Sequence, residues 1–164
     1  MALIILGLDP GTATTGYGVV THDGVSARHI AHGCFLTPKT DSPAARLHDI
    51  AKSLKAVLRQ YQPDLVAVEE LFFARNVTTA MKVSQARGVL LQTAAAAGIP
   101  VRSYTPLQVK QSLTSYGRAD KAQVQKMVKM ILGLPHIPTP DDAADALAVA
   151  ITAAHSHTLE QIIK

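Results

Sequence analysis

The sequence has few cysteines, few aromatic residues and no long apolar run. Its 164 residues include one cysteine, Cys34, no tryptophan, three phenylalanines and four tyrosines. A single cysteine excludes a disulfide framework and a cysteine-rich zinc module, and we expect a cytoplasmic protein. No apolar stretch approaches the about 20 residues that span a bilayer, so we expect no membrane segment. The apolar residues 2–6 lack a preceding basic segment and run into Gly7-Leu8-Asp9, which is typical of a strand and not of a signal peptide.

The composition indicates a folded globular protein. Hydrophobic residues make up 48% and charged residues 17% of the chain. The length suits one compact domain spanning residues 1–164, with enough interior for a sizeable core.

The net charge of +4 is distributed unevenly along the chain. Residues 1–74 have a net charge of −1, residues 75–129 have nine basic side chains against the single acid Asp120, and residues 130–164 have a net charge of −3. The middle segment therefore has a net charge of +8, which favours a polyanionic partner. The alternative is that these basic residues form the solvated faces of ordinary helices.

The pattern of apolar residues and turn residues predicts an α/β fold. We expect strands at residues 3–8, 16–22, about 25–36, 65–68 and 101–104. Helices are expected from Ser42-Pro43 to about Tyr61, from about Val77 to Ala97, from Thr105-Pro106, from Asp120 to about Gly133, and from Thr139-Pro140 to about His157. Antiparallel strands followed by alternating strands and helices predict a mixed five-stranded sheet flanked by helices.

Acidic residues occur in three places where solvated charge is not expected. Asp9 ends the first apolar strand, Glu69 and Glu70 end a second, and Asp142 and Asp145 lie in an Ala- and Leu-rich helix. If the two strands are parallel neighbours, Asp9 and Glu69 emerge together at one edge of the sheet. Asp142 and Asp145 are three residues apart and share a helix face.

Such a group of carboxylates needs cations to offset its mutual repulsion. Oxygen ligands select hard ions, so we expect Mg²⁺, with Mn²⁺ as a substitute. Two such ions form the arrangement used for phosphodiester hydrolysis, which makes Asp9, Glu69, Asp142 and Asp145 the candidate catalytic and metal-binding residues.

Simpler structural roles are open for several of these residues. Asp9 is suited to a turn in Asp-Pro-Gly, and Asp142 has the spacing of a capping box begun by Thr139. One of Glu69 and Glu70 is expected at the surface. Cys34 is expected to be a small core residue and not a nucleophile.

Candidate nucleic-acid contacts follow Glu69-Glu70 in the chain. Phe72 and Phe73 are adjacent, and either they are core residues or one ring stacks on an unpaired base. The basic residues after them fit a phosphate-binding face. These are Arg75, Lys82, Arg87, Lys110, Arg118 and Lys121.

Several short segments together resemble the bacterial RuvC family of Holliday-junction resolvases. They are Leu6-Gly7-Leu8-Asp9-Pro10-Gly11, Thr15-Gly16-Tyr17-Gly18, Val68-Glu69-Glu70-Leu71-Phe72, Gln85-Ala86-Arg87-Gly88, Val109-Lys110-Gln111 and Asp142-Ala143-Ala144-Asp145-Ala146-Leu147. Each is weak alone, but the ordered set covers about residues 3–155 and is specific. Glu70 is a departure, since relatives can have an amide there.

The resemblance implies a ribonuclease H-like fold and a homodimeric, divalent-metal endonuclease. Such enzymes act in recombination and repair, where they cut four-way DNA junctions by paired nicks that leave 5′-phosphate and 3′-hydroxyl ends. The resemblance also implies two ions held by Asp9, Glu69, Asp142 and Asp145, with Phe72 stacking near the junction centre and Lys110 and Lys121 contacting DNA. It further implies a dimer interface on the helix of Gln85-Ala86-Arg87-Gly88, and the RuvA–RuvB branch-migration complex as a partner.

Two other functions are compatible with parts of the sequence. Asp9-Pro10-Gly11-Thr12 is similar to the first phosphate loop of actin-like and sugar-kinase ATPases, but those proteins need two such domains around a nucleotide. A non-catalytic junction scaffold would bind DNA without magnesium-dependent cleavage.

Overall fold

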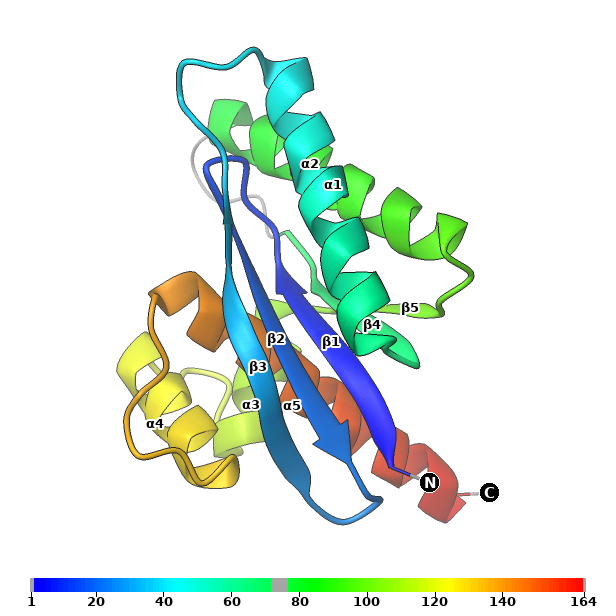
Figure 1. Cartoon of the computed structure of the whole chain (residues 1–164). Coiled ribbons are helices and arrows are strands. Elements are labelled where there is room, and N and C mark those ends of the chain that lie inside the picture. The colour runs from blue at the N-terminus through cyan, green and yellow to red at the C-terminus, as the bar shows by residue number, and fades with distance from the viewer. Residues whose placement is uncertain (1, 72–76, 164) are drawn as a thin grey trace.

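A computed structural model describes residues 2–71 and 77–163 of the chain (Figure 1). The elements, in order, are β1 (Leu3–Asp9), β2 (Thr14–His22), β3 (Ala27–Leu36), α1 (Pro43–Tyr61), β4 (Leu65–Glu69), α2 (Val77–Ala96), β5 (Val101–Tyr104), α3 (Pro106–Thr114), α4 (Lys121–Ile131) and α5 (Asp141–Ile163). Within these residues, no helix combines the length and apolar character needed to cross a membrane.

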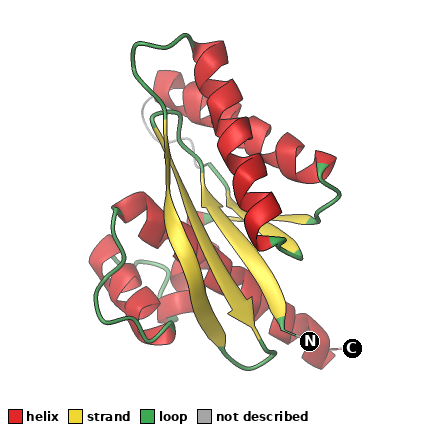
Figure 2. Ribbon diagram, viewed as in Figure 1, coloured by secondary structure: helices red, strands yellow, loops and turns green. Residues whose placement is uncertain are grey.

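The five strands form one mixed sheet in the order β3-β2-β1-β4-β5 (Figure 2). β1, β2 and β3 pair antiparallel, whereas β4 pairs parallel with both β1 and β5. The predicted mixed five-stranded α/β sheet is therefore confirmed.

Helices cover both faces of the sheet, and each face has its own core (Figure 1). Alternate residues of the central strands point into opposite cores. Ile5 packs on the side of α3, α4 and α5, whereas Leu6 packs on the side of α1 and α2. This period-two alternation accounts for the uninterrupted apolar runs in β1 and β4.

Most helix starts lie where the capping residues predict them. The Ser42 hydroxyl accepts a hydrogen bond from the Ala45 N–H, and Thr105 and Asp120 form capping boxes with Gln108 and Gln123. Each cap satisfies a backbone donor that the first helical turn leaves without a partner.

Some boundaries differ from the prediction. β3 begins at Ala27 and not near residue 25, because the Asp23 carboxylate accepts hydrogen bonds from the N–H groups of Val25 and Ser26 and holds them in the turn. α5 continues to Ile163, beyond the predicted end near His157.

Candidate active site

Asp9 and Glu69 lie side by side at one edge of the sheet, as the sequence predicts. Asp9 is the last residue of β1 and Glu69 the last of β4, and these parallel strands are in register at Leu8 and Val68. Both side chains belong to the alternate positions that face α5. Glu70 follows on the opposite face, where it is exposed and lines a separate cavity with Arg87.

α5 brings Asp142 and Asp145 to the same place. The helix lies close to β1 and β2 because glycines leave room for its backbone. A Cβ atom at Gly16 would lie 1.9 Å from the Asp142 carbonyl oxygen, and one at Gly7 would lie 2.1 Å from that of Ala146. Gly16 is paired directly with Asp9, so the first turn of α5 rests beside the Asp9 carboxylate.

The electrostatics of the cluster show that the four carboxylates interact. Burial, together with Glu69, Asp145 and Asp142, raises the pKa of Asp9 to about 8. Burial and Asp145 also raise the pKa of Glu69, and a hydrogen bond with Asp9 partly opposes that shift. The strand pair therefore shares a proton in the absence of a cation, which is the behaviour expected of crowded carboxylates.

The structure bears on two simpler roles considered for these acids. The capping box for Asp142 is wrong, because α5 begins at Asp141 and the first helical N–H groups, of Ala143 and Ala144, donate to the Pro140 carbonyl. Asp9 is not merely a turn residue, because its carboxyl group is hydrogen bonded to that of Glu69.

Asp141 and Asp142 point to different surroundings. Asp142 is half-buried, and its negative charge contributes to the raised pKa values of Asp9 and Cys34. Asp141 is exposed, and its Oδ2 lies 3.5 Å from the Lys121 ammonium. Asp142 is therefore the residue that joins Asp145 in the cluster.

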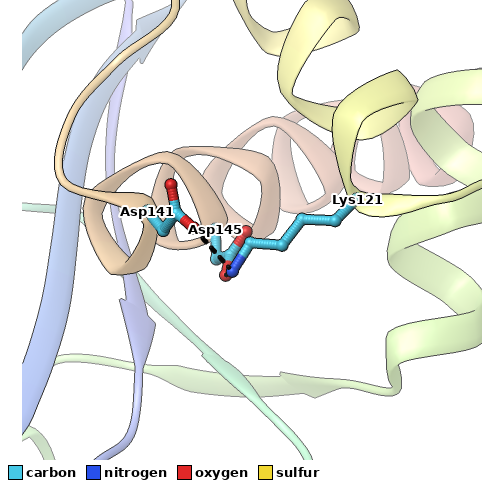
Figure 3. A network of polar contacts seen from close by, with 3 residues as sticks. All are labelled: Lys121, Asp141 and Asp145. Atoms are coloured by element: carbon cyan, nitrogen blue, oxygen red, sulfur yellow. Dashed lines mark ion pairs between the residues drawn. The ribbon is translucent and has the colours of Figure 1, made fainter.

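The donor set of the cluster fits a hard divalent cation. Four carboxylates offer only oxygen ligands, and burial together with neighbouring negative charge raises the pKa values of Asp9, Glu69 and Asp145, so a cation would stabilise their charged forms. Among the described residues, however, no three acidic, histidine or cysteine side chains already surround one point closely enough to hold a metal ion. One of the carboxylates is engaged elsewhere, since Asp145 Oδ2 lies 3.0 Å from the Lys121 ammonium (Figure 3).

Two lysines and two of the carboxylates line one cavity. It has a volume of about 200 Å³, and its lining includes Lys110 and Lys121 as well as Glu69 and Asp145.

The other predicted DNA contacts lie away from this cavity or outside the described residues. Arg118 is exposed in the turn between α3 and α4. Lys82 is exposed on α2, beside a second cavity of about 330 Å³ that includes Arg46. Phe72, Phe73 and Arg75 lie outside the described residues.

Arg87 has a role that the sequence interpretation missed. Its Nε donates to the Glu69 carbonyl oxygen at 3.3 Å and its Nη2 donates to the Ser103 hydroxyl at 2.7 Å. The guanidinium group is half-buried between β4 and β5 and holds the backbone of Glu69, a structural role that the sequence interpretation of Arg87 as a phosphate-binding residue did not include. The buried small residue Ala86 beside Arg87 was the available signal for a helix packed closely on the sheet at this position.

Cys34 lies closer to the cluster than expected for a core residue. Cys34 lies on β3 opposite Gly16 of β2, is half-buried, and accepts a hydrogen bond from the Ala143 backbone. Burial and the charge of Asp142 raise the pKa of the thiol to about 11, which agrees with the prediction that it is not a nucleophile.

Comparison with known proteins gives a consistent family match. Residues 5–153 match the family model described as crossover junction endodeoxyribonuclease RuvC. The chain is 54% identical to crossover junction endodeoxyribonuclease RuvC of Syntrophomonas wolfei, with 98% of this chain and 93% of that one covered. It is 56% identical to the protein of that name from Rubrobacter xylanophilus, with 95% and 87% covered.

The fold is also similar to solved structures. RuvC of Thermus thermophilus in complex with a Holliday junction substrate superposes with a TM-score of 0.91 and 39% identity, covering 96% of each chain. The fowlpox virus resolvase in complex with Holliday junction DNA superposes with a TM-score of 0.61 at 16% identity, which indicates a shared fold.

Proposed function

The chain belongs to the RuvC family of crossover junction endodeoxyribonucleases, and from that premise we propose that it resolves four-way (Holliday) DNA junctions in recombination and repair. The observation that carries this proposal is the cluster of Asp9, Glu69, Asp142 and Asp145 beside a cavity to which Lys110 and Lys121 contribute. A buried cluster of like charges is costly, and cation binding is the function that offsets that cost. The reaction is hydrolysis of a phosphodiester bond that leaves 5′-phosphate and 3′-hydroxyl ends.

Asp9, Glu69, Asp142 and Asp145 are the proposed ligands of two divalent cations. Mg²⁺ is the proposed ion and Mn²⁺ a substitute, because all the donors are carboxylate oxygens. When bound, such ions supply activation of a water nucleophile and stabilisation of the leaving oxygen. Asp9 lies between Glu69 and the start of α5, which suits it to contact both ions.

The basic side chains around the cluster are the proposed DNA contacts. Lys110 and Lys121 line the cavity at the carboxylates and are suited to hold the phosphate that is cut. Lys82 and Arg118 are exposed farther away and are suited to contact flanking phosphates. Phe72 and Arg75 are proposed contacts from the resemblance alone.

We propose a homodimer, because two symmetric nicks require two active sites and a two-fold dimer supplies them. On α2, Val77 is 71% and Met81 is 61% exposed, and Ser84 and Gly88 continue the same helix face. This stripe of apolar and small residues supports the predicted interface. The single nuclease domain over residues 1–164 and the RuvA–RuvB partnership stay predictions.

The test is cleavage of a synthetic four-way junction compared with linear duplex, in Mg²⁺, in Mn²⁺ and in EDTA. We expect paired nicks in the junction with either metal, little cutting of the duplex, and none in EDTA. Asp9→Asn should lower the cleavage rate by more than about a thousandfold while junction binding persists.

Two outcomes would contradict the proposal. Binding of junctions without cleavage in either metal would favour the scaffold function. Full activity of Asp9→Asn would exclude the carboxylate cluster as the catalytic site.

A further inference from the structure

The positively charged ammonium group of Lys121 lies beside Asp145, one of the proposed metal ligands. Its ammonium Nζ lies 3.0 Å from Asp145 Oδ2 and 3.5 Å from Asp141 Oδ2 (Figure 3). The Asp145 side chain is 26% exposed, so its ion pair is partly shielded from water. The Asp141 side chain is 68% exposed and its longer ion pair is weaker.

The position of Lys121 in its own helix does not explain its charge. Lys121 is the first residue of α4, directly after the N-cap Asp120. A cation in the first turn opposes the helix dipole, so the lysine gains nothing from α4 itself. The positive charge of Lys121 is instead stabilised by the carboxylates of Asp141 and Asp145 on α5.

An ammonium group and a divalent cation cannot both occupy the same side of Asp145. With Lys121 at 3.0 Å, the Asp145 oxygen is directed toward α4, which agrees with the absence of a ready-made three-ligand site among the described residues. A metal bound on that side of Asp145 would therefore compete with Lys121 for the carboxylate. The second cavity lysine, Lys110, forms no ion pair within the described part of the chain, although its charge acts on Glu69.

The cavity also offers the lysine a second anion. Lys121 and Asp145 line the space in which we place the DNA phosphate, so a bound phosphate lies within reach of the displaced ammonium group.

We propose that Lys121 is an internal counter-ion that occupies Asp145 in the DNA-free protein and transfers to a DNA phosphate when the junction binds, so that metal binding and junction binding favour each other. This inference rests on the proposed function, because it assumes a metal at Asp145 and DNA in the cavity. Lys121 is a positioning residue in this scheme, and the coupling is reciprocal because each ligand removes the ion pair that opposes the other.

The first test measures metal binding to the full chain without DNA. Mn²⁺ titration followed by electron paramagnetic resonance counts free ions directly and does not depend on activity. Lys121→Met keeps the length of the side chain and removes the charge, so Mn²⁺ should bind about threefold to tenfold more tightly than to the parent. Lys110→Met removes the same charge from the same cavity without breaking an ion pair to Asp145, so its gain should stay below about twofold. Equal gains in the two variants would overturn the competition.

The second test measures junction binding in EDTA by fluorescence anisotropy. Asp145→Asn removes the shorter of the two ion pairs of Lys121 and leaves only the longer, more exposed one with Asp141, so it should tighten binding more than Asp142→Asn, which removes the same charge but leaves both ion pairs intact. The difference between the two variants should vanish when both also carry Lys121→Met, because the double-mutant cycle isolates the contribution of the lysine. A difference that persists without Lys121 would overturn the transfer.

These outcomes are separable from those of the proposed function. If Lys121→Met binds Mn²⁺ no more tightly than Lys110→Met while the parent cuts junctions, the inference fails and the function stands. If the Mn²⁺ result holds but no junction is cut, the competition at Asp145 stands and the proposed function fails.

Discussion

At the scale of single residues, strand geometry separates two adjacent glutamates. β4 alternates between the two cores, so Ala67 and Glu69 face α5 while Val68 faces α1 and α2. Glu70 continues the alternation and is exposed on the side of Arg87. The Glu70 carboxylate therefore does not join the site.

Glu69→Gln and Glu70→Gln form a matched pair that tests this assignment. Each substitution replaces one carboxyl group with an amide at the C-terminal end of β4. We expect Glu69→Gln to lower junction cleavage by about a thousandfold, because a metal ligand is lost, and Glu70→Gln to stay within about threefold of the parent. Steady-state cleavage in Mg²⁺ measures both, and similar losses in the two variants would show that the alternation does not decide the ligand.

The raised pKa of Asp9 makes the metal-free protein sensitive to pH. Between the usual carboxyl value of 3.8 and about 8, folded Asp9 keeps a proton that the unfolded chain has released. The folded state binds more protons in this window, so the free energy of unfolding contributed by Asp9 falls as the pH rises.

Asp9→Asn removes this dependence, since asparagine does not titrate. In EDTA at pH 8, we expect the variant to be more stable than the parent, on the order of 1–3 kcal/mol, with the difference disappearing near pH 4. Urea unfolding at a series of pH values measures it, and Glu70→Gln, on the exposed face, is the control. A constant difference across the range would mean that Asp9 does not hold the proton.

At the scale of elements, the approach of α5 to the sheet assembles the site. Gly7, Gly16 and Gly18 lie on the face of β1 and β2 under this helix, and at each of them a Cβ atom would meet α5 at 2.7 Å or less. The Asp-Ala-Ala-Asp segment reaches Asp9 only because these positions lack side chains.

Gly16→Ala tests this packing. The added methyl group would displace the first turn of α5, which holds Asp142 and leads directly to Asp145. We expect a loss of about 1–3 kcal/mol in the free energy of unfolding and a fall of about a hundredfold in cleavage. Denaturant unfolding and Mn²⁺ titration at a temperature where the variant is folded separate the two effects. Metal binding equal to that of the parent would show that α5 does not depend on this contact.

Local signals predicted most elements, and long-range packing explains the exceptions. The caps at Ser42, Thr105 and Asp120 act within one helical turn, so the sequence reveals them directly. The sequence predicted that Asp9 and Glu69 lie together, because both residues end apolar segments that form parallel neighbouring strands. The inward turn of Arg87 and the ion pair of Lys121 with Asp145 depend on how separate elements pack, which no local pattern encodes.

At the scale of the whole molecule, the net charge of +4 is an average over opposed parts. Basic side chains and acidic ligands meet at one cavity, and each proposed divalent ion would add two positive charges at the place where DNA is cut. The arrangement favours DNA binding by the metal-loaded protein over the metal-free one.

The proposed paired cutting of a symmetric junction requires the proposed dimer, and therefore the face of α2 that we propose as its interface. Met81 lies in the middle of that face and is 61% exposed, while Met130 on α4 is 71% exposed outside it. Met81→Glu places two charges near each other across a two-fold axis and should shift the protein to monomers in light-scattering measurements. Met130→Glu should leave the mass unchanged.

The monomeric variant keeps every carboxylate, so it should still nick a junction at high concentration but should lose the simultaneous pairing of cuts. A supercoiled plasmid with one extruded junction distinguishes these outcomes, because single nicks give relaxed circles and paired nicks give linear product. If Met81→Glu stays dimeric and makes linear product while Met130→Glu does not, the subunits meet through α4 and not through α2.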